Sequence, residues 1–482
     1  MLTNSTMQYL KNQAYINGTW TSTNSTFPVY NPFNGELIAE VADCGTQETQ
    51  QAIEAAQAAF LTWRGKSAAG RAKILRRWYE LQLQHIDELA ELLTTEQGKP
   101  LAEAKGEIRY GASFVEWFAE EARRVYGDVI PGHGRDKRIT VIKQPVGVVG
   151  AITPWNFPNA MITRKVAPAL AAGCTVVIKP SDFTPLSALA LAALAEEAGF
   201  PPGVFNIVTA KDPVPVGDEL TSNSLVKKIS FTGSTRVGKM LLAKCAPQVK
   251  KVSLELGGNA PFIVFDDADI DDAVSGCIAS KFRNAGQTCI CSNRIFVHRS
   301  VHDTFNKKLT EKIKELKVGN GLEEGVVIGP MINDSAVDKS ERLLHDAVQH
   351  GARVLTGGQR GEGQFFQPTL VAEVKPEMKI FSEEIFGPVA AIYAFDTEEE
   401  VIQLANDTEY GLAAYFYGRD YARIWRVAEA LDYGMVGINT GMISSAVAPF
   451  GGVKESGFGR EGSKYGMDDY LNIKYMCWGG VQ

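Results

Sequence analysis

The sequence contains few cysteines and histidines, and their arrangement is not that of a disulfide-stabilised or metal-binding protein. Seven cysteines and six histidines are spread over 482 residues. An odd number of scattered cysteines does not suit a disulfide framework, and no pair has the spacing of a zinc ribbon. We therefore expect reduced thiols, a cytoplasmic location and no bound metal. The cysteines are Cys44, Cys174, Cys245, Cys277, Cys289, Cys291 and Cys477.

Long apolar segments and an excess of basic residues are also missing. The most apolar window, residues 146–152, is far too short to span a bilayer. Residues 1–14 lack the apolar core of a signal peptide. Lysine and arginine number 49 against 56 aspartates and glutamates, which gives a net charge of −7 and no basic surface for nucleic acid. We expect neither a membrane nor a nucleic acid among the partners.

The order of predicted elements indicates an α/β protein. With 482 residues and 45% hydrophobic composition, the chain is long enough for two or three domains. Short buried strands that alternate with helices predict a parallel, doubly wound sheet, which binds nucleotides at the carboxyl ends of its strands. A second α/β unit begins near residue 261. We predict strands over 146–152, 175–178, 205–208 and 228–231, and helices over 46–60, 68–96, 101–125, 159–172 and 185–197.

Cys289 is the candidate reactive cysteine. It follows a run of small and polar residues, 284–288, that suits neither a long helix nor a strand. A turn of this kind can lift one thiol out of the fold and direct it at a ligand. The alternative is that Cys289 is a small buried hydrophobe, which is the usual fate of a free cysteine.

Two further polar residues follow predicted buried strands. Asn156 lies between Pro154 and Pro158, and a rigidly held amide can donate to a developing oxyanion; alternatively, it is a turn cap. Glu255 lies between two leucines, where partial desolvation raises a carboxyl pKa towards that of a general base. A paired structural acid explains Glu255 equally well.

Residues 231–239 form a strand, a small-residue turn and a helix start, which suits phosphate binding by backbone amides. Gly233, Gly238 and Lys239 fit the spacing of a P-loop, but Met240 stands where that loop needs a hydroxyl for Mg²⁺. We therefore expect pyrophosphate binding and not nucleotide hydrolysis. Arg164 and Arg283 are cations near the proposed chemistry, and together they could hold a carboxylate bidentately.

Taken together, these motifs resemble the NAD(P)-dependent aldehyde dehydrogenases, in order and spacing, across essentially all of the chain. Within that family the chain is most similar to the succinate-semialdehyde dehydrogenases, through residues 161–165, 281–285, 289–291, 443–445 and 459–465. The family motifs are Pro-Trp-Asn-Phe-Pro at 154–158, Lys-Pro at 179–180, Phe-Thr-Gly-Ser-Thr at 231–235, Glu-Leu-Gly-Gly-Asn at 255–259, Gly-Gln-Thr-Cys at 286–289, Glu-Glu-Ile-Phe-Gly-Pro at 383–388 and Pro-Phe-Gly-Gly at 449–452.

The resemblance implies an aldehyde dehydrogenase-like fold of two doubly wound α/β domains and a small β flap. Residues 1–123 and 145–254 would form the cofactor domain, 255–447 the catalytic domain, and 124–144 with 448–482 the oligomerisation segment. A homo-oligomer, either dimer or tetramer, is expected. The implied reaction is oxidation of succinate semialdehyde to succinate, as in GABA degradation; glutarate semialdehyde, or a broader range of aldehydes, is the alternative.

The resemblance also implies roles for individual residues. Cys289 would be the nucleophile that forms a thiohemiacetal and then a thioester, Asn156 the oxyanion donor and Glu255 the general base. NAD or NADP would be the cofactor, and both are expected to work, with NAD preferred. Trp155, Lys179, Ser181, Asp182, Gly233 and Ser234 would line the adenosine and pyrophosphate site, Glu384 and Phe386 the nicotinamide site, and Arg164, Arg283 and Ser445 would hold the substrate carboxylate.

Cys291 lies two residues beyond Cys289 and is a candidate redox partner. In an extended strand, the Cα atoms of such a pair are about 6.5 Å apart, at the limit of disulfide geometry. The preceding small residues suggest a loop that can bend, and a reactive thiolate is readily oxidised. We expect peroxide to form a strained, reversible Cys289–Cys291 disulfide; the alternative is that Cys291 is only a small buried residue.

Overall fold

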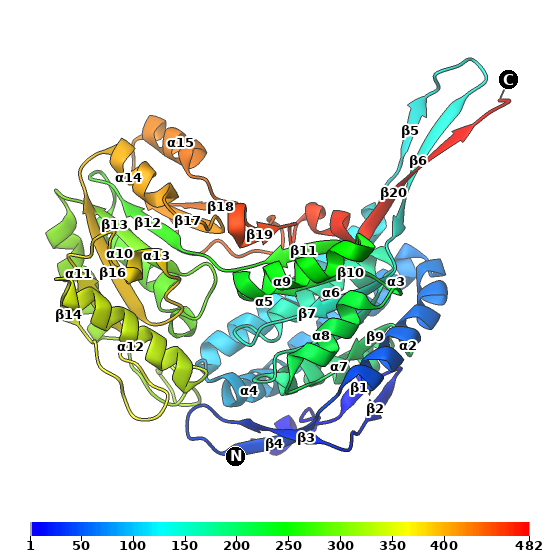
Figure 1. The fold of residues 1–482 in the computed structure, drawn as a ribbon, viewed down its shortest axis with the longest axis horizontal. Helices are drawn as coiled ribbons and strands as arrows, with labels where there is room; N and C mark the ends of the chain where they lie inside the picture. Colours follow the sequence, from blue (N-terminus) through cyan, green and yellow to red (C-terminus); the bar gives the residue numbers. More distant parts are fainter. Residues whose placement is uncertain (1, 482) are drawn as a thin grey trace.

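Two mostly parallel β-sheets form the framework of the molecule, each in its own lobe (Figure 1). The computed structural model describes residues 2–481. In the first sheet, neighbouring parallel strands end together, since Ile152 pairs with Lys179 and Phe231, and Thr232 pairs with Glu255. In order, this sheet contains β19 (Gly457–Phe458), β11 (Lys251–Glu255), β10 (Val226–Thr232), β7 (Val148–Ile152), β8 (Thr175–Lys179), β9 (Phe205–Ile207), β1 (Ala14–Ile16) and β2 (Thr19–Thr21).

Helices cover both faces of the first sheet because successive strand residues point to opposite sides. Val148 and Val177 pack with α2 (Thr46–Gly65), α8 (Pro213–Ser222) and α9 (Thr235–Cys245). Val149 and Val176 pack into the larger core on the other face. The helices of that face are α3 (Ala68–Gln84), α4 (Ile86–Gln97), α5 (Leu101–Glu121), α6 (Ala160–Ala172) and α7 (Pro185–Ala198).

The second lobe repeats this arrangement (Figure 1). Its sheet contains β14 (Arg353–Thr356), β15 (Thr369–Ala372), β16 (Val389–Phe395), β13 (Ser292–His298), β12 (Ala260–Val264), β17 (Ala413–Tyr417) and β18 (Met435–Ile438), with only β14 antiparallel. One face packs on α10 (Ile270–Lys281) and α11 (His302–Lys314). The other packs on α12 (Asp334–Gln349), α13 (Lys379–Ser382), α14 (Glu398–Asn406) and α15 (Tyr421–Ala430).

Two small β elements lie outside the lobes. The hairpin of β3 (Thr26–Tyr30) and β4 (Leu37–Ala42) lies near the N-terminus, whereas the short α1 (Asn4–Met7) contacts α4 through Thr6 and Glu91. A three-stranded arm of β5 (Asp128–Pro131), β6 (Arg138–Pro145) and β20 (Leu471–Trp478) projects from the first lobe (Figure 1). The arm exposes apolar side chains, among them Val129 and Ile473.

The predicted helix over 68–96 is wrong in one respect, because it is two helices. His85 leaves the helical conformation, with φ −108° and ψ 29°, and separates α3 from α4. The apolar stripe continues on both sides of this break, so its periodicity could not reveal the bend. The predicted helix over 101–125 likewise ends earlier, at Glu121. Among residues 2–481, no helix is both long and apolar enough to cross a membrane.

Candidate active site

Cys289 lies on a loop whose backbone is bent by three consecutive residues with positive φ. Asn284, Ala285 and Gly286 have φ of 51°, 53° and 76°, a region that only glycine adopts at little cost. A Cβ at Gly286 would collide with the carbonyl oxygen of Gly387. The loop therefore ends the helical path after α10, as the small and polar residues suggested, and leaves Cys289 only partly buried.

The space in front of Cys289 is a cavity of about 270 Å³ between the two lobes. Its walls come from the strand ends of the first sheet and from loops and α12 of the second lobe. The cavity is mostly apolar with a few polar groups, which is typical of a ligand site. It is lined by Pro154, Trp155, Asn156, Thr232, Gly233, Ser234, Leu256, Gly257, Cys289, Ala336, Lys339, Glu384 and Phe386.

Burial strongly affects the titration of the Cys289 thiol. Desolvation raises its pKa to about 12, Arg164 opposes this shift, and Glu255 and Glu384 add to it. The resting thiol is therefore protonated at neutral pH and must lose its proton before it can act as a nucleophile.

Glu255 is the last residue of β11, and its side chain is buried. Its Oε2 atom has no hydrogen-bond partner among residues 2–481. Burial raises the pKa of this carboxyl well above its ordinary value, and the negative charge of Glu461 raises it further. A carboxyl with a raised pKa and a free oxygen beside a reactive thiol has the properties of a general acid–base group.

A buried ion-pair cluster lies next to Glu255, and sequence reasoning missed its centre, Glu461. This carboxylate accepts hydrogen bonds from Arg164 Nε and Lys165 Nζ. Burial alone would raise the pKa of Glu461, but Arg164 and Lys165 hold it below its ordinary value. Arg164 is thus already paired, which the expectation of a free substrate-binding cation did not foresee. Its Nη2 atom nevertheless lacks a hydrogen-bond partner within the described chain.

Asn156 follows β7, and its amide reaches the loop that carries Cys289. Its Nδ2 atom donates to the carbonyl oxygen of Gln287 at 3.1 Å. An amide nitrogen carries two hydrogens, so one donor remains for a ligand in the cavity. The carbonyl of Asn156 accepts from Lys99 Nζ and from Asn284 Nδ2. The backbone of this residue is therefore held from two sides.

Three further residues are candidates for carboxylate binding, and Arg283 is close enough to influence the pKa of Cys289. Arg283 stacks on Phe157, with 5.3 Å between its Cζ and the ring centroid, and forms no ion pair with any residue that the structure describes. Ser445 is partly buried, and its hydroxyl accepts from the backbone of Val447 at 3.4 Å. Tyr110, which sequence reasoning missed, has a buried hydroxyl without a hydrogen bond of normal geometry in residues 2–481.

The residues predicted to hold the nicotinamide end share the cavity with Cys289. The rings of Trp155 and Phe386 pack edge to face, with 5.7 Å between their centroids. Glu384 Oε1 accepts from the backbone of Gly258 at 3.0 Å, and burial raises the pKa of this carboxyl to about 7. Ser234 caps the start of α9 beside Gly233. The edge of the cavity is therefore aromatic on one side and has a helix N-terminus on the other.

The residues predicted to contact the adenosine end lie farther along the same sheet edge. Lys179 ends β8, the neighbour of β7, and Ser181 follows it. Asp182 forms a salt bridge with Lys211 at 3.0 Å and lines a separate cavity of about 390 Å³. Lys239 forms an ion pair with Glu455 at 2.6 Å, so its ammonium is not directed at a bound phosphate as in a P-loop.

Cys291 is buried, and its thiol donates to the carbonyl oxygen of Lys281 at 3.2 Å. The backbone N–H of Cys291 donates to the carbonyl oxygen of Thr288 at 3.0 Å. This bond closes a tight turn around Cys289, where the geometric argument from the sequence had assumed an extended strand. Both thiols are free.

Gly258 is a further site residue that sequence reasoning quoted without a role. A Cβ atom at this position would collide with the carbonyl oxygen of Cys289. The segment after Glu255 and the Cys289 loop therefore touch backbone to backbone. Only a residue without a side chain permits this approach, and the Gly-Gly pair after Glu255 is the sequence signal that could have indicated it.

Comparison with known proteins identifies the arrangement. A model of the aldehyde dehydrogenase family matches residues 20–476. The chain is 60% identical over 472 residues to the glutarate-semialdehyde dehydrogenase of Pseudomonas putida, with 98% of each chain covered. It is also 60% identical over 473 residues to the succinate-semialdehyde dehydrogenase (NADP+) of Escherichia coli, with 97% of this chain and 98% of that protein covered.

Solved structures give the same result. An NADP-dependent enzyme of E. coli has a TM-score of 0.98 and 59% identity, covering 99% of this chain and 100% of that one. The betaine aldehyde dehydrogenase of Staphylococcus aureus in complex with NAD+ has a TM-score of 0.96 and 36% identity, covering 99% of this chain and 97% of that one. The predicted α/β fold and the resemblance to this family are therefore confirmed.

The contact at Gly258 gives a first prediction. Gly258→Ala should destabilise the protein by about 1–3 kcal/mol, because overpacking forces the Cys289 loop to move. A displaced and better hydrated thiol should also react faster with iodoacetamide. Thermal unfolding and alkylation kinetics measure both effects.

Gly217→Ala is the matched control. Gly217 lies inside α8, and no atom lies within 4 Å of the position that an alanine Cβ would occupy there. Alanine is also the better helix former at this position by about 1 kcal/mol. The control should unfold at the same or a higher temperature with an unchanged alkylation rate. If Gly258→Ala and Gly217→Ala have the same unfolding temperature and alkylation rate, the proposed constraint of Gly258 on the Cys289 loop is wrong.

Proposed function

Because this chain belongs to the aldehyde dehydrogenase family and is an oxidoreductase that acts on aldehydes with NAD or NADP, we propose that its substrate is succinate semialdehyde, which it oxidises to succinate. The observation that carries this proposal is a group of hydrogen-bond donors with unused capacity around Cys289. A substrate with an anionic group at the end opposite its aldehyde would satisfy them.

Three of these donors come from different elements. Tyr110 is on α5, Arg164 on α6 and Arg283 follows α10. Arg164 and Arg283 are both close enough to lower the pKa of Tyr110, which burial raises, so the phenol stays protonated and able to donate. A buried donor without a partner is costly, and a carboxylate accepts several charge-assisted hydrogen bonds at once. Ser445 is proposed as a fourth donor.

Glutarate semialdehyde is the second candidate, and the relatives favour neither. One 60% identical relative is named for glutarate semialdehyde and the other for succinate semialdehyde. The two substrates differ by one methylene, which pockets discriminate by only about 10- to 200-fold. Both substrates have the distal carboxylate that the donors require. We therefore expect the protein to oxidise both, with different values of kcat/KM. Oxidation of succinate semialdehyde would give the chain its place in GABA degradation.

The residues around the 270 Å³ cavity fit a nicotinamide ring. Trp155 and Phe386 supply aromatic walls, and Gly233 and Gly257 leave room at the polar edge. We propose that Glu384 and Phe386 orient the ring, and that Lys179, Ser181, Asp182 and Ser234 hold the rest of the cofactor. When bound, the oxidised nicotinamide accepts the hydride that the substrate carbon loses.

Acylation begins at Cys289. The thiol passes its proton to solvent water, and the sulfur forms a bond to the aldehyde carbon to give a tetrahedral thiohemiacetal. Negative charge that develops on the aldehyde oxygen accepts a hydrogen bond from the second Nδ2 hydrogen of Asn156. Loss of hydride from the same carbon then restores the carbonyl and leaves a thioester on Cys289.

Hydrolysis of the thioester requires a base, and we assign this role to Glu255, because its pKa is raised and it lies close enough to influence the pKa of Cys289. Its free Oε2 removes a proton from a water molecule as the water oxygen attacks the thioester carbon. The carbon–sulfur bond breaks, the carboxylic acid product leaves, and Glu255 passes its proton to the released thiolate, which regenerates the Cys289 thiol. Arg164 and Lys165 stabilise the ionised form of Glu255, although burial and Glu461 oppose it.

We propose that both NAD and NADP serve as cofactor. Asp182 can accept a hydrogen bond from an adenosine 2′-hydroxyl and would repel a 2′-phosphate. The salt bridge from Lys211 reduces this repulsion. Lys179, three residues before Asp182, supplies a second positive charge that reduces it further.

We propose that the chain forms a homo-oligomer, a dimer or a tetramer, through the arm of β5, β6 and β20. Val129 on β5 and Ile473 on β20 are 83% and 73% exposed, which is unfavourable for apolar side chains on an isolated arm. Burial of this surface against another copy would remove it from water.

Substrate recognition gives the second prediction. Arg283→Met should lower kcat/KM for succinate semialdehyde by about 10- to 100-fold, since a charge-assisted hydrogen bond contributes about 1.5–3 kcal/mol. An uncharged aldehyde of equal length, such as butanal, should lose little. Steady-state kinetics with both aldehydes provides the comparison.

Arg64→Met serves as the control, because Arg64 also stacks on a phenylalanine, Phe60, at 5.3 Å. This variant should leave both rates unchanged. Equal losses for butanal and succinate semialdehyde in Arg283→Met would mean that the arginine supports the fold and not the specificity.

The pH dependence of turnover is the third prediction. Glu255 acts as a base only when ionised, so kcat should rise with pH, with a midpoint well above its ordinary value of 4.5. Glu255→Gln should lose this rise and turn over about 10²- to 10⁴-fold more slowly, yet still give one burst of reduced nicotinamide.

Cys289→Ala should give neither the burst nor turnover while it still binds the cofactor. Pre-steady-state absorbance of the reduced nicotinamide distinguishes the two variants. Substantial steady-state oxidation by Cys289→Ala would exclude the covalent mechanism.

Reversible oxidation gives the fourth prediction. We propose that peroxide links Cys289 to Cys291, since the tight turn over 288–291 brings the two residues near each other. Cys291→Ala should keep its activity, but activity lost to peroxide should no longer return with dithiothreitol. Cys277→Ala, which removes another buried free thiol, should recover like the wild type. If Cys291→Ala recovers equally well, the second thiol is not involved.

A further inference from the structure

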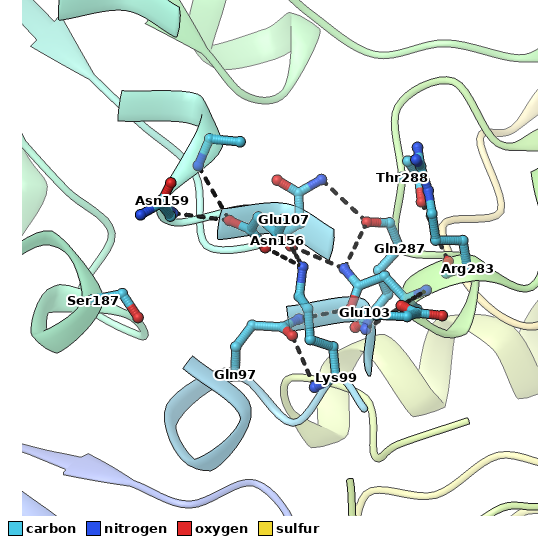
Figure 2. Close-up of polar contacts among 12 residues, drawn as sticks. Gln97, Lys99, Glu103, Glu107, Asn156, Asn159, Ser187, Arg283, Gln287 and Thr288 are labelled. Carbon is cyan, nitrogen blue, oxygen red and sulfur yellow. Dashed lines mark hydrogen bonds and ion pairs between the residues drawn. The ribbon is translucent and has the colours of Figure 1, made fainter. Parts of the chain in front are cut away.

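Lys99 and Glu107 form a buried ion pair at the corner between α4 and α5, outside the residues that contact the cavity (Figure 2). The Nζ–Oε2 distance is 2.6 Å, and the two residues are 2% and 3% exposed. The corner also contacts the second lobe, because the N–H of Leu101 donates to the carbonyl oxygen of Gly321 at 2.8 Å. The pair therefore lies where the two lobes meet.

The pair binds the backbone on both sides of the turn that follows Asn156. Lys99 Nζ donates to the Asn156 carbonyl oxygen at 2.7 Å and lies 3.8 Å from the centroid of the Phe157 ring. The other oxygen of Glu107, Oε1, accepts from the backbone N–H groups of Asn159 and Ala160 at 2.9 and 3.2 Å. Residues 156–160 are thus held by one ammonium and one carboxylate.

The same carbonyl connects this segment to the Cys289 loop. Asn284 Nδ2 donates to the Asn156 carbonyl oxygen at 3.0 Å, and the Asn284 side-chain oxygen accepts from Gln97 Nε2 at 3.0 Å. The Asn284 N–H donates to Glu103 Oε2 at 2.8 Å. Figure 2 shows the Lys99 side chain beside both Asn156 and Gln97. The corner therefore sets the position of both loops.

Stability alone does not explain a fully buried pair of this kind. Desolvation of two charges is expensive, and apolar residues of similar volume are often as stabilising or more so. Burial lowers the pKa of Lys99, and Glu107 counteracts this. What a charged pair supplies and an apolar pair does not is a set of directed hydrogen bonds to the Asn156–Ala160 backbone.

We propose that Lys99 and Glu107 are positioning residues for the oxyanion donor: they hold the Asn156 backbone so that its amide faces the carbon that Cys289 attacks. The inference rests on the proposed roles of Asn156 and Cys289. Neither residue of the pair contacts the substrate in this account, and both act through Asn156.

The test uses Lys99→Met with Glu107→Gln, which removes both charges while it keeps similar volumes and the oxygen that accepts from α6. Misplacement of a catalytic group by about 1 Å can cost 10²-fold in rate. We expect kcat for succinate semialdehyde to fall about 10- to 100-fold, with KM and cofactor affinity within about 3-fold of the wild type. Alkylation of Cys289 by iodoacetamide, which develops no oxyanion, should proceed at the wild-type rate.

A double-mutant cycle with Asn156→Ala separates positioning from general support of the fold. In the Asn156→Ala background, the Lys99 and Glu107 substitutions should lower kcat by less than about 3-fold, because the group that they position is absent. An equal fold-loss in both backgrounds would overturn the inference while the proposed function stands. Failure of the wild type to oxidise any aldehyde would overturn the proposed function and the inference with it.

Lys228→Met is the matched control for loss of a buried lysine. Lys228 is also fully buried, lies 4.9 Å from the Tyr470 ring centroid and donates to the hydroxyl of Ser253. A loss of kcat in this control as large as that in the pair variant would contradict positioning. If the pair variant does not fold, Glu107→Gln alone replaces it, with an expected loss of about 3- to 10-fold that again depends on Asn156.

Discussion

The site depends on one steric constraint, the backbone contact between Gly258 and Cys289. Gly258 lies on the segment that leaves β11 of the first sheet and enters β12 of the second, and Cys289 lies on the loop that enters β13, the neighbour of β12. A Cβ at Gly258 would collide with the Cys289 carbonyl oxygen, so no side chain can stand between them. This contact brings the carboxylate at the end of β11 to the thiol on the second lobe. It also brings Asn156 close enough to bind the Gln287 carbonyl at 3.1 Å. The three residues proposed as nucleophile, oxyanion donor and base, namely Cys289, Asn156 and Glu255, therefore come from three separate elements.

Burial and neighbouring charges act in opposite directions on the titratable groups around Cys289. Desolvation raises the pKa of both the Cys289 thiol and the Glu255 carboxyl, so it disfavours the ionised form of each group. Arg164 counteracts both shifts, but it is held by Glu461 and not by a ligand. In the proposed function, a substrate carboxylate accepts hydrogen bonds from the Nη2 of Arg164 and the hydroxyl of Tyr110, neither of which has a partner within the described chain.

The sequence was sufficient for the fold class, the family and most residues of the cavity, because these depend on local patterns. A short apolar run such as residues 175–178 predicts a buried strand of a parallel sheet. The motif Gly-Gln-Thr-Cys indicates the family without knowledge of any tertiary contact. Contacts between distant segments were not predictable. No local pattern indicates that Glu461 would neutralise Arg164, or that Lys99 would bind the Asn156 carbonyl, since each pair is joined only by tertiary packing. The break at His85 was missed because an apolar stripe does not record a change of helix axis.

The central claim is that a carboxylate-bearing aldehyde becomes a thioester on Cys289. The most direct measurement is mass spectrometry of the Glu255→Gln protein after incubation with succinate semialdehyde and the oxidised cofactor, followed by acid quenching and proteolysis. The account predicts that the peptide containing Cys289 gains the mass of one succinyl group and that this gain disappears under hydroxylamine. Reduced cofactor formed without any modification of Cys289, or with the succinyl group on another residue, would contradict it.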